Sequence, residues 1–335
     1  MEFTEIPNLK NKVSRIGLGT WSIGGWLWGG TDEKNAIATI RHALESGINL
    51  IDTAPAYGLG VSEEIVGKAL KQHGNRERVV IATKVGLNWK DQQLFRDCRK
   101  ERIRKEIEDS LRRLQVDYID LYQVHWPDPE TPIAETAEVM RQLLKEGKIR
   151  AIGVSNYSVD QMGTFQKITP LHSVQPPFNL FERETEKTIL AYCKEKHLAT
   201  LGYGSLCRGL LTGKMGLDTQ FHGDDLRKSD PKFQQPRFSQ YLKCVERLDQ
   251  WAQQHYQRTV LSLAIRWALD KGINIALWGA RKPEQLDAIS TVWGWKLTPQ
   301  DFKEIDDILK ETISKPLGPE FMAPPSRKEI LQHAG

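Results

Sequence analysis

The chain has 335 residues, of which 39% are hydrophobic and 27% are charged. This composition provides enough apolar material for a large core and excludes a disordered chain. The formal net charge is only +4, and no basic arm is present, so we expect no nucleic-acid partner. The four cysteines show no C-x-x-C spacing, so we expect free thiols in a reducing compartment, without a disulfide framework or a metal site.

No segment has the properties of a membrane span. The longest uncharged run, residues 16–31, is short for a span and is interrupted by glycines. Residues 1–5 do not resemble a basic and then apolar leader. We therefore expect a cytoplasmic protein that does not contact a membrane.

The elements that the sequence predicts alternate regularly along the chain. Residues 3–15 predict a short β-hairpin turning at Pro7-Asn8, which could close the bottom of a barrel. Predicted strands begin at 16, 48, 79, 118, 149, 171, 198 and 273. Predicted helices cover 32–46, 62–72, 99–114, 132–146, 158–167, 182–196, 238–271 and 283–292. Eight strand–helix units favour an α/β fold of the TIM (β/α)8 barrel type, in one domain over residues 1–335.

Two stretches lie outside this alternation. Residues 206–236 follow the seventh strand, are rich in polar residues and would lie on the catalytic face. They could form a lid or a surface excursion without a role. The tail from Thr298 predicts an extra C-terminal helix, followed by a segment rich in Pro and Gly over residues 316–325.

Ionisable residues close three successive predicted strands. Asp52 ends the apolar run that begins at Ile48, and Tyr57 lies in the turn that Pro55 and Gly58 would force. Lys84 and His125 end the next two runs. The carboxyl ends of parallel strands meet at one edge, so the four side chains would share one cleft. Taken singly, each could be a packing or loop-fastening residue, but four at equivalent positions favour a catalytic site.

Several common motifs are absent. No G-x-G-x-x-G follows a strand, and neither G-x-S-x-G nor H-E-x-x-H occurs. Residues 209–215 approach a P-loop, but the stretch is one residue short and Met215 replaces the required Ser or Thr. A Rossmann site, a common hydrolase and a zinc protease are therefore not supported.

The chain resembles the aldo-keto reductase superfamily over nearly its whole length. Residues 278–283 and 318–325 are similar to the bacterial family 11 enzymes, including the inositol-operon type. The resemblance implies a catalytic tetrad at Asp52, Tyr57, Lys84 and His125.

The resemblance also implies an NADPH (NADP+) site and a carbonyl site. Ser155, Asn156 and Gln175 would bind the nicotinamide carboxamide, and Tyr203 would stack on its ring. The full implied cofactor set is Trp21, Asp52, Ser155, Asn156, Gln175, Tyr203, Gly204, Ser205, Leu206, Arg208, Gly209, Lys214, Gly279, Arg281 and Gln285. The expected substrate contacts are Tyr57, His125, Trp21, Trp89 and Trp126, and Trp26 and Trp28 are expected nearby. Two departures from the family pattern are Trp278, where a proline is common, and Ile289, where an adenine-binding asparagine is common.

Carbonyl reduction requires a proton donor for the developing alkoxide. We expect Lys84 to lower the pKa of Tyr57 by about 1–3 units, Asp52 to keep Lys84 charged, and His125 to orient the carbonyl or share in its protonation. The sequence therefore predicts a monomeric, metal-free, NADPH-dependent reductase of aldehydes, with ketones and dicarbonyls as further substrates. The alternatives are an NADPH-binding regulatory or sensor subunit, like the barrel subunits of potassium channels, and an isomerase or lyase acting on a phosphorylated sugar.

Overall fold

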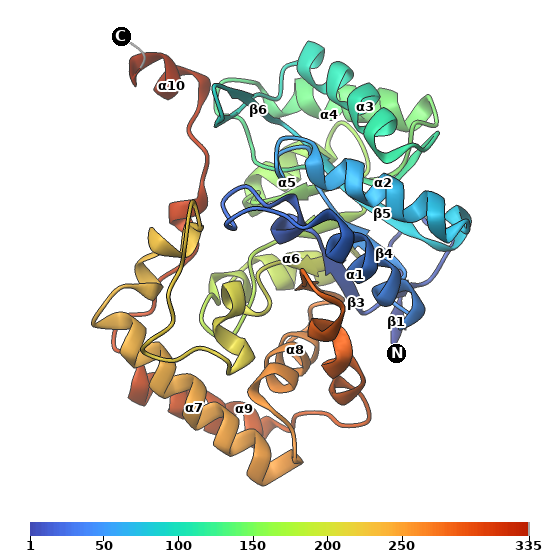
Figure 1. Ribbon diagram of the computed structural model, residues 1–335. Helices are drawn as coiled ribbons and strands as arrows, with labels where there is room; N and C mark the ends of the chain where they lie inside the picture. The colour runs from blue at the N-terminus through green and yellow to red at the C-terminus, as the bar shows by residue number, and fades with distance from the viewer. Residues whose placement is uncertain (334–335) are drawn as a thin grey trace.

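Eight parallel strands form a closed barrel at the centre of the molecule (Figure 1). The computed structural model describes residues 1–333. The barrel strands follow one another around the barrel in chain order, which confirms the predicted TIM barrel. They are β3 (Ile16–Gly19), β4 (Leu50–Asp52), β5 (Val80–Val85), β8 (Ile119–Val124), β9 (Ile149–Ser155), β10 (Ser173–Gln175), β11 (Ala199–Gly202) and β12 (Ile275–Gly279).

Helices surround this barrel, mostly where the sequence predicts them (Figure 1). They are α1 (Glu33–Glu45), α2 (Val61–His73), α3 (Lys100–Leu114), α4 (Ile133–Lys145), α5 (Val159–Gln166), α6 (Ile189–Glu195), α7 (Arg237–Tyr256), α8 (Val260–Asp270), α9 (Pro299–Thr312) and α10 (Arg327–His333). α9 is the extra C-terminal helix that the sequence predicts, and α10 is one that it does not.

The predicted helix 182–196 is wrong over its first half. The Asn179 side chain accepts hydrogen bonds from the backbone N–H groups of Phe181 and Glu182, so the chain forms a turn there. The α-helix α6 begins only at Ile189. The predicted helix 283–292 is a 3₁₀-helix, η7 (Pro283–Val292).

The N-terminal hairpin closes one end of the barrel, as predicted. Its strands are β1 (Phe3–Thr4) and β2 (Val13–Ser14), which pair antiparallel. Ile6 and Val13 are buried in one cluster with inward-facing strand residues such as Leu121. Burial of these apolar side chains leaves only the opposite end of the barrel, where the strands finish, open for chemistry.

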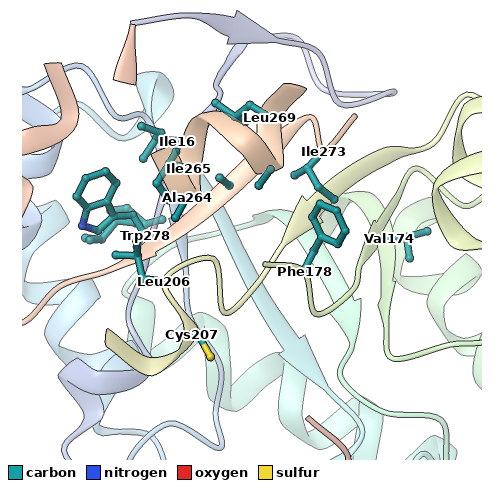
Figure 2. Close-up of a cluster of buried hydrophobic side chains, with 14 of the residues drawn as sticks. Ile16, Val174, Phe178, Leu206, Cys207, Ala264, Ile265, Leu269, Ile273 and Trp278 are labelled. Atoms are coloured by element: carbon teal, nitrogen blue, oxygen red, sulfur yellow. The ribbon is translucent and has the colours of Figure 1, made fainter. Parts of the chain in front are cut away.

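A second apolar layer lies between the strands and the helices. Trp278 belongs to it and is 1% exposed. Figure 2 shows it in the cluster that also holds Ile16, Leu206 and Ala264. The large side chain of Trp278 therefore packs within this layer. This packing gives a structural role to the tryptophan that stands where a proline is common.

A second hairpin, absent from the sequence prediction, follows β5. It consists of β6 (Leu87–Lys90) and β7 (Gln93–Arg96). The C-terminal tail crosses beside it, because the backbone N–H of Arg96 donates to the carbonyl oxygen of Pro325 at 2.9 Å. Figure 1 shows α10 next to β6 as a result.

The long segment 206–236 contains the short helices η4 (Cys207–Thr212), η5 (Leu226–Lys228) and η6 (Pro231–Phe233). Although it is polar, its ends are anchored by buried ion pairs. The Arg208 guanidinium donates to Asp230 and Glu182, each at 2.6 Å. Lys232 Nζ lies 2.9 Å from the same Glu182 carboxylate and donates to the carbonyl oxygen of Gly318 at 2.8 Å. These contacts fasten the segment to the barrel and to the C-terminal tail.

Within residues 1–333, none of the helices combines the length and the apolar character that crossing a membrane requires.

Candidate active site

The predicted tetrad is assembled at the C-terminal ends of β4, β5 and β8. Lys84 Nζ donates to Asp52 Oδ1 at 2.6 Å and to the Tyr57 hydroxyl oxygen at 3.1 Å. A third hydrogen bond of 2.9 Å goes to the carbonyl oxygen of Thr53. The His125 ring lies edge-on to the Tyr57 ring, with centroids 5.8 Å apart. The four side chains therefore form one contiguous group.

The turn that carries Tyr57 is fixed by close backbone packing. Gly58 has a positive φ of 66°, and a Cβ there would lie 2.2 Å from the carbonyl oxygen of Gly24. Only a glycine allows this approach. Trp21 then stacks against the Tyr57 ring at a centroid distance of 6.0 Å, so the phenol is held from two sides.

The electrostatics of Tyr57 differ from the prediction. Burial raises its pKa well above the usual value, and the nearby Asp52 carboxylate raises it further. The predicted net lowering of the Tyr57 pKa is therefore wrong, because desolvation disfavours the phenolate and the Asp52 charge opposes that of Lys84. Tyr57 is therefore a neutral phenol that is able to donate a proton.

Burial also controls the charges of its neighbours. It lowers the pKa of Lys84, while the Asp52 carboxylate acts to raise it. Burial, together with the charge of Lys84, lowers the pKa of His125 well below its usual value. The imidazole is therefore neutral near pH 7, with one nitrogen available as a hydrogen-bond donor.

Two cavities meet at the tetrad. One, of about 490 Å³, is lined by Tyr57, His125 and Trp126 together with mainly apolar side chains. The other, of about 330 Å³, runs between the ends of β3, β11 and β12 and reaches Arg281 and Gln285. Four side chains line both cavities: Trp21, Tyr57, Tyr203 and Met322.

Most of the predicted cofactor residues line these cavities. Those in the first are Trp21, Ser155, Asn156, Gln175 and Tyr203. Those in the second are Trp21, Asp52, Tyr203, Gly204, Ser205, Leu206, Arg208, Gly209, Gly279, Arg281 and Gln285. Lys214 is exposed and lines neither cavity, and Ile289 is buried away from both.

The predicted substrate tryptophans divide in the same way. Trp21, Trp26 and Trp126 line the larger cavity, and Trp28 lines the smaller one. Trp89, on β6, lines neither cavity, and the guanidinium of Arg102 on α3 lies 5.1 Å from its ring centroid.

The side chains expected to bind an amide are joined to the tetrad. Asn156 Nδ2 donates to the carbonyl oxygen of His125 at 2.9 Å, and the Tyr203 hydroxyl donates to Asn156 Oδ1 at 2.9 Å. Gln175 Nε2 donates to Asp52 Oδ2 at 2.7 Å. Among residues 1–333, no hydrogen-bond donor reaches Gln175 Oε1, so this oxygen is free to accept one.

Several cavity residues were missed by the sequence analysis. Leu87 and Leu94 come from the unpredicted hairpin, and Phe321, Met322 and Pro324 come from the tail. Their places depend on contacts between distant segments, such as the hydrogen bond of 2.7 Å from Arg96 Nε to the carbonyl oxygen of Pro324. The sequence marked residues 318–325 through their resemblance to the family and through their prolines, but neither signal indicates where the tail packs.

The chain is similar to known proteins over most of its length. A family model described as the aldo/keto reductase family matches residues 15–310. The chain is 62% identical over 331 residues to the aldo-keto reductase YhdN of Bacillus subtilis, covering 98% of this chain and 100% of that protein. It is 40% identical over 292 residues to the NADH-specific methylglyoxal reductase of Escherichia coli, covering 82% and 88%.

Two solved structures share the fold. The glycerol dehydrogenase AKR11B4 from Gluconobacter oxydans superposes with a TM-score of 0.87 at 52% identity, over 96% of this chain and 99% of that one. An aldo/keto reductase from Klebsiella pneumoniae, solved with NADP and acetate, gives a TM-score of 0.68 at 27% identity, over 89% and 92%.

Proposed function

This chain belongs to the aldo/keto reductase family and is an oxidoreductase, and we propose that it reduces small aldehydes and dicarbonyl compounds to alcohols with NADPH. Tyr57 serves as the general acid. The observation that carries the proposal is the 3.1 Å hydrogen bond from Lys84 Nζ to the Tyr57 hydroxyl, at the junction of the two cavities.

The residues around the two cavities fit a nicotinamide cofactor, as enzymes of this family use. On the side of the larger cavity, Gln175 Oε1, Ser155 Oγ and Asn156 Oδ1 offer acceptors for the NH₂ group of a carboxamide. Tyr203 offers an aromatic ring at the point where the cavities meet. Arg281 and Arg227 place two cations at the end of the smaller cavity away from Tyr57, where a phosphate would be stabilised. When bound, the cofactor supplies the hydride.

The chain's own residues then transfer a proton to the carbonyl oxygen of the substrate. A carbonyl oxygen placed between Tyr57 and His125 would accept hydrogen bonds from the phenol and from the neutral imidazole. As negative charge develops on that oxygen, the Tyr57 hydroxyl gives up its proton. Lys84 stabilises the resulting phenolate through its ammonium, which Asp52 holds in place. Because His125 is neutral, it orients the carbonyl and does not act as the acid.

The shape of the larger cavity supports small carbonyl compounds as substrates. Its volume is about 490 Å³, and its walls include the rings of Trp21, Trp126 and Phe321. The E. coli relative acts on methylglyoxal according to its name, and the Gluconobacter structure is named a glycerol dehydrogenase. We therefore propose short aldehydes and vicinal dicarbonyls, methylglyoxal among them, as the substrate class.

The experiment is a steady-state assay that follows the absorbance of the reduced nicotinamide. Methylglyoxal, an aliphatic aldehyde and benzaldehyde are each supplied with NADPH or NADH, with Tyr57→Phe as the matched control. We expect turnover by the wild type with NADPH, and little by the variant. Tight NADPH binding without turnover of any carbonyl would contradict the proposal and favour a sensor role.

A further inference from the structure

Gln123 lies fully buried beneath the tetrad, and the sequence analysis did not single it out. It sits on β8 directly beside Lys84 on β5, since the two are register partners in the barrel. Its Nε2 donates to Asp52 Oδ2 at 3.3 Å, and its Oε1 accepts from Gln175 Nε2 at 3.3 Å. Both ends of the amide are therefore engaged with groups of the active site.

Gly153 provides the space that this side chain uses. Gly153 lies on β9, where it is the register partner of Gln123 on β8 and of Ser173 on β10. A Cβ at Gly153 would lie 2.8 Å from Gln123 Cγ and 2.5 Å from Ser173 Oγ. Without a side chain on β9, Gln123 reaches across that strand toward Gln175, so the amide contact depends on this gap.

We propose that Gln123 is a positioning residue that holds the Asp52 carboxylate in the rotation that keeps Lys84 on Tyr57. The inference rests on the proposed function, since it concerns the same proton donor. It adds a residue that touches neither the carbonyl nor the reacting atoms.

The two oxygens of the Asp52 carboxylate have different partners. Asp52 Oδ1 is occupied by Lys84 Nζ, and Oδ2 is held by the amide groups of Gln175 and Gln123. An ionised carboxylate only accepts hydrogen bonds, so both amides must present their NH₂ groups to it. Without Gln123, the only amide within residues 1–333 that still donates to Asp52 Oδ2 is that of Gln175. The Gln175 amide would also lose its own hydrogen bond to Gln123 Oε1. The carboxylate is then free to turn, and the Lys84 ammonium follows it.

Gln123→Met tests this with a side chain of similar length that cannot hydrogen-bond. We expect kcat to fall about ten- to hundredfold, as for a lost hydrogen bond to a charged group, while KM for the carbonyl changes less than about threefold. Ser173→Ala is the matched control, because Ser173 Oγ is buried in the same layer without a hydrogen-bond partner among residues 1–333. It should retain wild-type kcat.

Gln123→Glu should give a pH dependence of kcat that would not arise if Gln123 only filled space. A protonated carboxyl can donate to Asp52 and accept from Gln175, as the amide does, whereas an ionised one would repel Asp52. Burial beside a carboxylate raises the pKa of a Glu side chain, so the variant should ionise between about pH 6 and pH 9. The other ionisable groups facing this layer, Tyr57, Lys84, His125 and Glu63, are common to the wild type and the variant. The ratio of variant to wild-type kcat should therefore fall at least about tenfold across that range.

Crystal structures of the cofactor-free wild type and Gln123→Met provide a readout that does not depend on turnover. We expect the distance from Lys84 Nζ to the Tyr57 hydroxyl to exceed about 3.5 Å in the variant. An unchanged distance, or a Gln123→Glu profile parallel to that of the wild type, would overturn the inference. Failure of the proposed function is distinct, because the wild type itself would then not reduce carbonyls.

Discussion

Arg281 Nη1 donates a hydrogen bond of 2.8 Å to the carbonyl oxygen of Trp28, which lies 253 positions earlier in the chain. A second bond from the same guanidinium reaches the carbonyl oxygen of Gly30. On its other side, the loop around Trp28 is held by Asp224, which accepts from the backbone N–H groups of Leu27 and Gly29 at 2.7 and 2.9 Å. Arg281 therefore fixes a wall of the smaller cavity, besides supplying charge for the proposed phosphate contact.

We expect Arg281→Ala to weaken NADPH binding by about ten- to hundredfold, because a charge-assisted contact to the 2′-phosphate is lost. NADH lacks that phosphate, so its affinity should fall only through release of the loop. Fluorescence titration of both cofactors measures the difference.

Asp224→Ala is the control for the loop contribution, since it releases the same loop and leaves the guanidinium in place. It should weaken both cofactors to the same small extent. Equal losses of NADPH and NADH affinity in Arg281→Ala would mean that this residue acts only on the loop.

Tyr57→Phe should lower kcat by about 10²- to 10⁴-fold, the range for removal of a general acid. NADPH affinity should remain near that of the wild type, because the ring and its stacking on Trp21 are retained. Steady-state kinetics and cofactor titration on the same preparation give both values. Wild-type turnover in the variant would exclude Tyr57 as the acid.

The tetrad was predictable from the sequence because its residues end consecutive apolar runs, and in a barrel these ends share one face. The hairpin of β6 and β7 was not predictable in this way. Its turn places Asp91 and Gln92 at positive φ, 48° and 64°, a conformation usually indicated by Gly or Asn. The pKa of Tyr57 was predicted in the wrong direction, since the sequence indicates the neighbouring charges but not the depth of burial. Gln123 was missed because a single glutamine in an apolar run gives no sign of its partners.

Lys84→Met should destabilise the protein by about 3–5 kcal/mol, because it leaves the buried Asp52 carboxylate without its cation. The double variant Asp52→Asn with Lys84→Met removes both charges and should recover much of that stability. Neither variant should regain turnover, since the tyrosine has lost its ammonium neighbour. Urea unfolding and kcat are measured on each. A double variant as unstable as the single one would show that packing, and not the unpaired charge, causes the loss.

The lowered pKa of His125 predicts a pH dependence of stability. Below about pH 6.5 the unfolded chain binds a proton at this residue that the folded protein does not. The unfolded state then binds more protons, so the free energy of unfolding falls as the pH falls, by up to about 1.4 kcal/mol per unit from this one group. Burial also lowers the pKa of His172, so the wild type carries contributions from both residues.

His125→Gln removes one of these contributions and leaves the other. We expect the variant to lose less stability than the wild type between about pH 7 and pH 5, as measured by urea unfolding at each pH. Its stability relative to the wild type should therefore rise toward acid pH. The same imidazole pKa predicts that carbonyl reduction by the wild type persists below about pH 6.5, because the histidine at the cavity wall remains neutral there. Parallel curves of unfolding free energy against pH for the two proteins would show that His125 takes up a proton as readily in the folded state as in the unfolded state. The proposed role of His125 as a neutral hydrogen-bond donor would then be wrong.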